Sequence, residues 1–295
     1  MKKISRRNVL VGGLTVTALA AVAIPTASAQ PTPEIVEALV ALEQRNNAHI
    51  GVYAADLQSG RTITHRQTDR FAMCSTFKTY AAARVLQKTE RGELALADTV
   101  SVEAADILPN SPITETRIGQ AITLAELCAA ALQRSDNAAA NYLLEAIGGP
   151  PAITEFARSI GDTETRLDRW EIELNSAVPG DPRDTSTPQA LGLGYQSLVT
   201  GSVLGSPART QLVEWMTANE TSSLRPGLPP GWVLADKTGS GDYGSTNDVG
   251  IAFGPGGRQV LLAVMARSAS DDPDAEGFRP VMSEIAQLIM PAVIG

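Results

Sequence analysis

Strand-like segments lie near both ends of this 295-residue chain, and helical segments fill the part between them. Two stretches with the strand pattern, 50–55 and 61–66, come early, and three more, 233–238, 248–253 and 259–267, come late. Strands so far apart can bury a common apolar face by joining one sheet. The sequence therefore predicts an α+β fold, an α/β sandwich with an antiparallel five-stranded sheet formed by both chain ends and an all-helical domain.

The middle of the chain is rich in alanine and helical in pattern. Residues 33–46 form an amphipathic helix ahead of the first strand, and Thr76–Arg91 is predicted as one helix. Thr123 and Glu126 have the spacing of a capping box, which marks the start of another helix. Residues 162–186 show no periodicity and carry many charges and prolines. Because a loop of that length in a compact domain is usually functional, we expect an active-site loop there.

The segment 1–29 has the features of an export signal. Arg6 and Arg7 form a twin-arginine pair, an apolar run spans 9–24, and Ala27-Ser28-Ala29 fits a cleavage site. The run is shorter than the ~20 residues of a membrane-spanning helix, so an uncleaved anchor is the less favoured alternative. We expect an exported chain, secreted or periplasmic, with no stable membrane span after cleavage.

Cleavage after Ala29 would leave a chain that begins at Gln30 and is still long enough for a large core. We divide it into a discontinuous α/β domain, 30–70 with 219–295, and an all-helical domain, 71–218, which contains the 162–186 loop. The net charge of −8 becomes −12 when the four positive charges of the signal are removed. So acidic a chain is a poor partner for nucleic acid or an anionic membrane.

Cysteine and histidine are too scarce for a disulfide framework or a metal site. Cys74 and Cys128 are the two cysteines, and at this point one bridge between them stays open. His49 and His65 are the two histidines, and they lack the spacing of a metal-binding pair. We therefore expect no cofactor and no metal.

Four short motifs combine residue types that can carry out chemistry. In chain order they are Ser75-Thr76-Phe77-Lys78, Ser135-Asp136-Asn137, Glu171-Ile172-Glu173-Leu174-Asn175 and Lys237-Thr238-Gly239. After the signal the chain keeps three lysines, Lys78, Lys88 and Lys237, and two of them fall in these motifs. Lysine is usually a solvated surface residue, so this concentration indicates a functional role.

The first motif suits a nucleophile and its base. Ser75 and Lys78 are three residues apart, which places them on one face of a helix. A serine hydroxyl needs a base to remove its proton, and a partly buried lysine can lose its charge and serve as one. The alternative is that Ser75 only caps the helix. A Ser-His-Asp triad is not expected, because no histidine accompanies a Gly-x-Ser-x-Gly elbow.

The four motifs in this order resemble those of the class A serine β-lactamases. The resemblance covers essentially the whole chain after the signal and includes the stretches 166–171 and 236–241. It implies an enzyme that opens the β-lactam ring of penicillins, and by extension cephalosporins, and so confers resistance to them. Small-molecule β-lactams would be its partners, and we expect a monomer.

The resemblance also implies a role for each catalytic residue. Ser75 would form a covalent ester with the opened ring, and Lys78 would help to remove its proton. Ser135 would pass a proton to the departing lactam nitrogen. Glu171 and Asn175 would hold the water that cleaves the ester. Lys78 and Glu171 both remain candidates for the base of the first step.

A second group of residues would hold the substrate. The residues that the resemblance places there are Asn137, Arg225, Lys237, Thr238, Gly239 and Ser240. Lys237, Thr238 and Ser240 would bind the substrate carboxylate, and backbone N–H groups of Ser75 and Ser240 would form an oxyanion hole. Arg169 and Asp184 resemble an ion pair that closes the loop around Glu171.

Two departures from the family concern the mouth of the site and the loop. Asn110 stands where many members have an aromatic residue, so stacking on the substrate is expected to be weaker. Ile172 follows Glu171 in place of the frequent proline, at a peptide bond that the resemblance implies to be cis.

Two further departures concern the cysteines. Carbapenem-hydrolysing members have a cysteine partner for the residue that matches Cys74, and Gly241 stands at its place, which argues against carbapenem hydrolysis. Ala82 stands where some members have a partner for the residue that matches Cys128. We therefore expect Cys128 to be a free buried thiol.

Two other classes of protein share part of this pattern. A penicillin-binding DD-peptidase would keep Ser75, Lys78, Ser135 and Lys237, but it would not need the Glu171 motif. A penicillin sensor would form the ester and keep it, and it would need a membrane segment for signalling. The loop motif supports rapid hydrolysis of the ester and so favours a β-lactamase over both alternatives.

Overall fold

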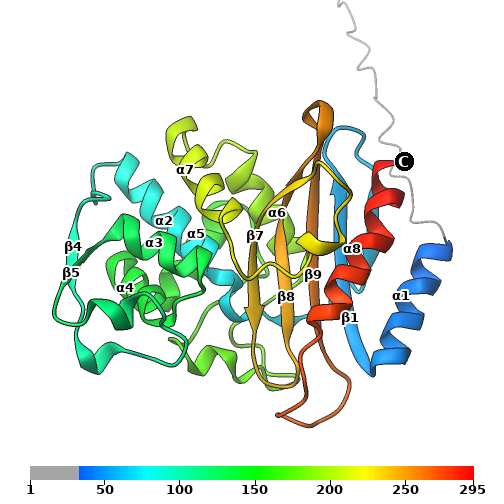
Figure 1. The fold of residues 1–295 in the computed structure, drawn as a ribbon, viewed down its shortest axis with the longest axis horizontal. Helices are drawn as coiled ribbons and strands as arrows, with labels where there is room; N and C mark the ends of the chain where they lie inside the picture. The colour runs from blue at the N-terminus through cyan, green and yellow to red at the C-terminus, as the bar shows by residue number, and fades with distance from the viewer. Residues whose placement is uncertain (1–32) are drawn as a thin grey trace, which may run out of the picture.

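The computed structural model describes residues 33–295, and its centre is one antiparallel sheet (Figure 1). The predicted signal lies outside the described residues. The strands are β1 (Ala48–Asp56), β2 (Thr62–His65), β7 (Val233–Ser240), β8 (Thr246–Phe253) and β9 (Gln259–Ser268). Their order across the sheet is β2-β1-β9-β8-β7, so the pairing of β1 with β9 joins the two ends of the chain. The predicted fold class is confirmed.

Helices cover both faces of this sheet. Helices α1 (Pro33–Asn46) and α8 (Arg279–Ile294) lie together on one face, on the right in Figure 1. Helix α6 (Pro188–Val199) packs on the other face against β1, β8 and β9. Because both faces are covered, the middle of the central strand β9 is an unbroken apolar run, and all of Val260–Ala266 is buried.

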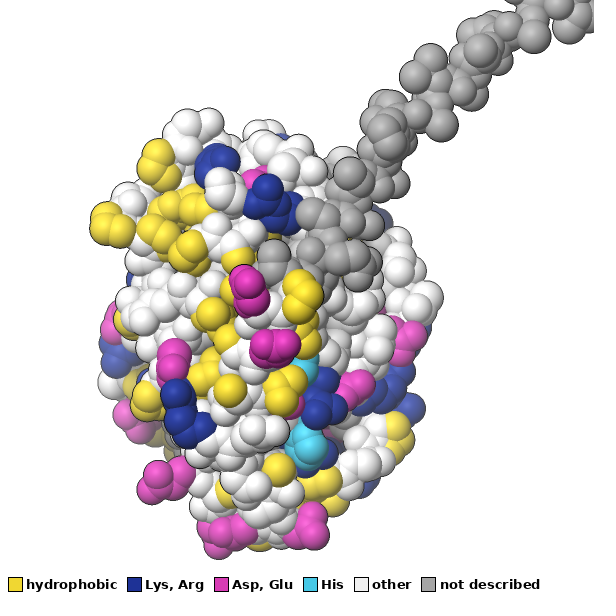
Figure 2. All heavy atoms as spheres, turned by 90° about the vertical axis from the view of Figure 1, so that its right-hand side faces the viewer, with side chains coloured by type: hydrophobic (Ala, Val, Ile, Leu, Met, Phe, Trp, Pro, Cys, Tyr) yellow, Lys and Arg dark blue, Asp and Glu magenta, His cyan; other side chains and the backbone are white. Residues whose placement is uncertain are grey.

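The outer side of the α1 and α8 layer carries mixed charges (Figure 2). Histidine side chains are visible on this face beside basic and acidic side chains. Glu43 of α1 accepts hydrogen bonds from the guanidinium of Arg66, and its carboxylate lies 3.3 Å from His65 Nε2. These contacts attach α1 to the end of β2.

The remaining helices lie on the same side of the sheet as α6, and the last of them also packs against β7. They are α2 (Lys78–Glu90), α3 (Leu124–Gln133), α4 (Asn137–Ile147), α5 (Pro150–Ser159) and α7 (Ser206–Thr217). The ring of Tyr80 in α2 meets that of Phe156 edge to face, with centroids 6.0 Å apart. The capping box at Thr123 and Glu126 is confirmed at the start of α3. The domain boundaries at 70/71 and 218/219 stay a prediction.

The structure differs from the sequence prediction in its shortest elements. The helix expected at Thr76–Arg91 opens with a 3-10 turn, Cys74–Phe77, before α2 begins. Two small strand pairs were not predicted: β3 (Phe71–Ala72) with β6 (Thr185–Ser186), and β4 (Thr99–Ser101) with β5 (Ala121–Thr123). Strands of two or three residues are too short to show an alternating pattern.

Short 3-10 turns occupy several connections: Ala104–Asp106, Thr114–Arg117, Glu173–Ser176, Arg225–Gly227 and Pro255–Gly257. The turn at Glu173–Ser176 lies inside the loop predicted at 162–186, and β6 forms the last two residues of that loop. Pairing of β6 with β3 therefore brings the end of this loop next to the segment that leads into α2.

Two leucines of α6 provide a matched test of packing on the sheet. Leu191 is fully buried, whereas Leu193 is 40% exposed. We expect Leu191→Ala to lower the free energy of unfolding by about 2–5 kcal/mol, since it removes buried methyl groups and leaves a cavity. Leu193→Ala should change it by no more than about 0.5 kcal/mol. Urea unfolding of both variants measures the difference, and equal losses would contradict the packing described for α6.

Candidate active site

Ser75 lies in the 3-10 turn before α2, at the floor of a cavity of about 290 Å³. The residues that line this cavity are Ser75, Asn110, Arg134, Ser135, Asn137, Asn175, Thr221, Thr238, Gly239, Ser240 and Arg279. They include members of all four sequence motifs. The fold thus brings together motifs that stand far apart in the chain, from Ser75 to Thr238.

The side chain of Asn247 and the close packing of Gly239 hold the turn that carries Ser75. Cys74 has a positive φ of 48°, and the side-chain amide of Asn247 donates to the carbonyl oxygens of Ala72 and Met73. Gly239 at the end of β7 packs directly on the turn, since a Cβ there would lie 2.6 Å from Met73 O and 3.2 Å from Ser75 N. Only glycine lets the strand come this close to the nucleophile.

The ammonium group of Lys78 lies between three acceptors. Its Nζ is 2.6 Å from Asn137 Oδ1, 2.9 Å from Ser135 O and 2.9 Å from Glu171 Oε1. Both side chains of the Lys78–Glu171 pair are fully buried. Ser75 Oγ lies 3.5 Å from the same Glu171 Oε1. Ser75 Oγ thus contacts Glu171 directly, Lys78 Nζ contacts the same carboxylate oxygen, and both groups remain candidates for the base.

Ser135 connects the two buried lysines. Its Oγ is 3.0 Å from Lys237 Nζ and 3.5 Å from Lys78 Nζ. Ser135 has a positive φ of 56°, and Asp136 next to it caps α4 by accepting the N–H of Ala139. This sharp turn directs the hydroxyl of Ser135 toward the lysines while its chain enters the helix.

Lys237 is buried in β7, and its surroundings disfavour its charge. Burial lowers the pKa of Lys237 to about 7, and the positive charge of Lys78 acts in the same direction. Its Nζ donates to Thr238 O at 2.8 Å as well as to Ser135 Oγ. Near neutral pH this ammonium can therefore gain or lose its proton.

Two asparagines hold Glu171 in place. Asn175 donates to Glu171 Oε2 at 2.6 Å, so the two side chains expected to hold the water lie side by side. Asn141 of α4 accepts the Glu171 N–H at 3.0 Å and donates to the Glu171 carbonyl at 3.1 Å. The peptide bond between Glu171 and Ile172 is cis, as expected. Asn141 was missed in the sequence, although it lies one helical turn after Asn137 on α4.

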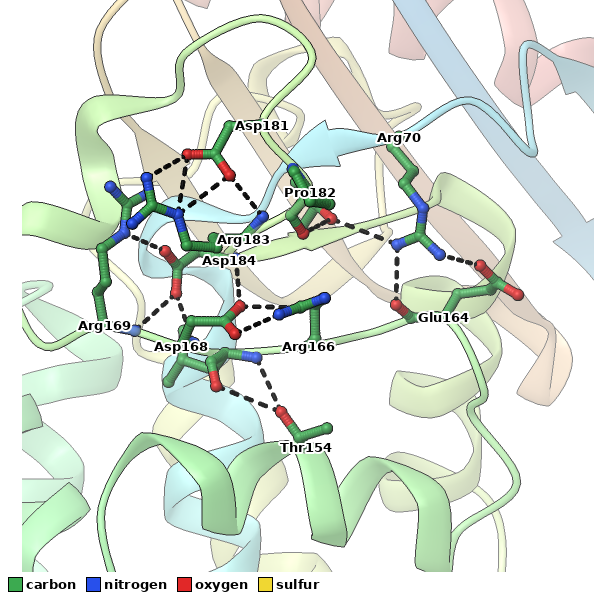
Figure 3. A network of polar contacts seen from close by, with 12 residues as sticks. Arg70, Thr154, Glu164, Arg166, Asp168, Arg169, Asp181, Pro182, Arg183 and Asp184 are labelled. Carbon is green, nitrogen blue, oxygen red and sulfur yellow. Dashed lines mark hydrogen bonds and ion pairs between the residues drawn. The ribbon is translucent and has the colours of Figure 1, made fainter.

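A polar network closes the loop at its base (Figure 3). Arg169 Nε is 2.6 Å from Asp184 Oδ2, which is the predicted ion pair. Asp184 Oδ1 also accepts the backbone N–H groups of Asp168 and Arg169, at 2.7 and 3.0 Å. In return, Asp184 N–H donates to Asp168 Oδ2 at 3.1 Å. Two aspartates thus hold the two ends of the loop against each other.

Arg70 adds a second link on the outer side of this network (Figure 3). Its guanidinium donates to the Glu164 carbonyl at 3.0 Å and to Thr185 Oγ1 at 3.3 Å, and it pairs with the Glu164 carboxylate. It therefore also joins the beginning of the loop to its end.

Arg225 is placed differently from the other predicted site residues, because it does not line the cavity. Its guanidinium donates to four acceptors: Asn219 O, Thr217 O, Leu234 O and Asp236 Oδ1. Its role in substrate binding stays a prediction. The arginines that do line the cavity, Arg134 and Arg279, were missed in the sequence. Only the position of Arg134 next to Ser135 could have drawn attention to it.

Both cysteines are free and buried. Burial raises the pKa of the Cys74 and Cys128 thiols, so both stay protonated. A Cβ on Gly241 would lie 2.8 Å from Cys74 Sγ, so the two positions are neighbours although they hold a single thiol. Within residues 33–295, no group of three or more His, Cys, Asp or Glu side chains lies close enough to hold a metal ion.

Comparison with known proteins places this site in a family. The model of the β-lactamase enzyme family matches residues 34–293. The chain is 40% identical to β-lactamase AST-1 of Nocardia asteroides, over 99% of this chain and 97% of the relative. It is 43% identical to the carbapenem-hydrolysing β-lactamase KPC of Klebsiella oxytoca, over 85% of this chain and 87% of the relative.

Solved structures agree with the sequence relatives. The reconstructed class A β-lactamase of the last common ancestor of Gram-negative bacteria superimposes with a TM-score of 0.83 at 46% identity, covering 88% of this chain and 98% of the other. A β-lactamase from Burkholderia phymatum gives 0.85 at 37% identity, with 88% and 98% covered. The family match, the relatives and the shared fold together show that the chain belongs to the class A β-lactamases.

Proposed function

We propose that the chain hydrolyses the β-lactam ring of penicillins and cephalosporins through a covalent ester on Ser75, and so confers resistance to them. One observation carries the proposal. Glu171 Oε1 lies 3.5 Å from Ser75 Oγ and 2.9 Å from Lys78 Nζ, and Ser75 lines the cavity. A nucleophile and two possible bases are thus close enough to act on one bound carbonyl group.

The first step forms the ester. Ser75 Oγ attacks the lactam carbonyl carbon, and its proton moves to Lys78 or to Glu171. The carbon–nitrogen bond of the ring then breaks, and Ser135 passes a proton to the nitrogen. Its contacts with both lysines suit this transfer, because Lys78 and Lys237 can replace the proton that Ser135 gives up.

The second step removes the ester. Glu171 takes a proton from a water molecule held with Asn175, the water oxygen attacks the ester carbonyl, and Ser75 regains its proton as its oxygen leaves. Asn175 and Asn141 support this role, since they orient the carboxylate and the backbone of Glu171. A DD-peptidase or a penicillin sensor would not require such an arrangement.

The substrate is held at the end of β7 and the start of α4. Lys237, Thr238 and Ser240 bind the ring carboxylate, and Asn137 binds the side-chain amide. Gly239 keeps the strand next to Ser75, as its close approach to Met73 O requires. Arg225, whose guanidinium contacts the Asp236 carboxylate at 3.2 Å, adds positive charge near the substrate carboxylate without lining the cavity.

We also propose that the segment 1–29 directs export and is then removed. In the described residues, no helix is long and apolar enough to cross a membrane. The exported chain should begin at Gln30 and be a monomer in solution. Intact-mass measurement and light scattering on the protein collected outside the producing cell would check both points. A mass that still includes the segment 1–29 would rule out cleavage after Ala29.

Mass spectrometry with benzylpenicillin tests the assignment of the two steps. The wild type should turn over many equivalents, Ser75→Ala should form no adduct, and Glu171→Ala should accumulate a persistent one because water is no longer activated. Glu173→Ala is the matched control, since this exposed carboxylate lies two residues away on the same loop. An adduct on Ser75→Ala, or rapid turnover by Glu171→Ala, would contradict the mechanism.

The pKa of Lys237 predicts the alkaline side of the pH profile. As the pH rises through about 7, the free enzyme loses the positive charge of Lys237 and with it an attraction for the substrate carboxylate. We therefore expect kcat/KM to fall about tenfold per pH unit above that value. The decline in kcat should begin at a higher pH than the decline in kcat/KM, because a bound anion stabilises the charged form of Lys237.

Lys237→Arg provides the check on this profile, because a guanidinium keeps its charge over the whole range. Its alkaline decline in kcat/KM should disappear or move up by more than one pH unit. An unchanged decline in a folded Lys237→Arg variant would assign the titration to another group.

A further inference from the structure

The mouth of the active-site cavity is lined by two positive charges and, among the described residues, by no carboxylate. Arg134 and Arg279 are the charged residues of the lining. The charge of Lys237 below them titrates near pH 7, whereas a guanidinium keeps its charge at any working pH. The mouth therefore holds a permanent positive charge that the mechanism above does not use.

Arg134 has donors to spare. It follows the last turn of α3 directly before Ser135, and its side chain is 44% exposed. Its Nη1 lies 3.0 Å from Glu220 Oε2, and the Glu220 side chain is itself 60% exposed. A guanidinium has five N–H groups, so one solvated carboxylate leaves several free for an anion.

Glu220 is held beside Arg134 by the backbone. The N–H of Glu220 donates to Gln133 O at 3.0 Å, so the two segments stay together when the ion pair opens. A substrate anion and the Glu220 carboxylate would therefore compete for the Arg134 guanidinium while the backbone at both residues stays where it is.

Arg279 is the second arginine with donors available for a substrate anion, whereas the donors of Arg225 are already used within the protein. Arg279 Nη2 makes one long hydrogen bond, 3.4 Å, to Thr221 O. Arg225 in contrast donates to three carbonyl oxygens and the Asp236 carboxylate. Arg134 and Arg279 thus line the cavity with N–H donors left over for an anion.

These arginines lie on a definite side of the cavity. Arg279 bonds to Thr221, and Thr221 Oγ1 in turn is 2.5 Å from Thr238 Oγ1. Glu220, the partner of Arg134, directly precedes Thr221. If the ring carboxylate binds at Thr238, the next group on the ring of a cephalosporin, its C3 substituent, faces this side.

We infer that Arg134 determines specificity by favouring cephalosporins with a second negative charge on the C3 substituent, with Arg279 adding to the attraction and Glu220 opposing it. The inference rests on the proposed function. Arginine suits the task because its planar donors match carboxylate and sulfonate oxygens. The effect is modest, about two- to fivefold per arginine, since exposed ion pairs are weak, and it decreases with salt.

A pair of cephalosporins that differ by one charge tests the inference. Cefamandole and cefonicid share the C7 side chain and differ by a sulfonate on the C3 tetrazole. The measured quantity is the ratio of kcat/KM for cefonicid to that for cefamandole at low salt. We expect this ratio to fall about two- to fivefold in Arg134→Gln, to fall also in Arg279→Gln, and to rise in Glu220→Gln.

Arg45→Gln is the matched control for the loss of one positive charge. Arg45 is also an exposed arginine in an ion pair with an exposed glutamate, Glu284, but it lies on α1 beyond the sheet. Its substitution should leave the ratio unchanged. In the wild type, the preference for cefonicid should shrink when the ionic strength is raised.

The outcomes separate the inference from the proposed function. An unchanged ratio in Arg134→Gln, or an equal loss for both compounds, would overturn the role given to Arg134 while both compounds are still hydrolysed. If the wild type hydrolyses neither compound and no penicillin, the proposed function itself fails. A lower ratio in Arg134→Gln together with a higher one in Glu220→Gln supports the inference.

Discussion

The buried ammonium group of Lys78 holds the candidate site together through its need for acceptors. A charge taken out of water without partners costs so much free energy that buried charges are found paired and hydrogen-bonded. Here the acceptors belong to separate segments, Ser135 and Asn137 at the start of α4 and Glu171 in the long loop. These segments have to meet the turn before α2 at one point, and Ser75 lies at that point.

Ordering a loop this long costs much conformational entropy. Glu171 can meet Lys78 only because contacts within the loop offset that cost. Asp184 closes the base by receiving Arg169 and two backbone N–H groups. Asn141 holds the backbone at Glu171 itself, between the two ends. The same α4 thus positions both Lys78 and Glu171, which keeps the two groups in register with each other.

Much of the architecture could be predicted because helices and strands leave a recognisable pattern of apolar residues in the sequence. The five strands stood out as strand-like runs between turns, α1 showed helical spacing, and the four motifs stood in order. The pairing of β3 with β6 was missed, since two residues carry no pattern. Asn141 was missed for another reason: asparagine in a helix has no distinctive signal until the partner backbone of Glu171 is placed beside it.

The residue types of the site, the family to which they belong, and the α+β fold with a sheet made by both chain ends all follow from the order of residues along the chain. These features depend on residue identity and on short-range spacing, which are properties of the chain alone. The tertiary structure decided which arginines face the cavity: Arg225, the predicted one, is occupied by Asp236 and three carbonyl groups, whereas Arg134 and Arg279 line the mouth. The direction of a long side chain depends on acceptors supplied by distant segments, and only packing brings those segments together.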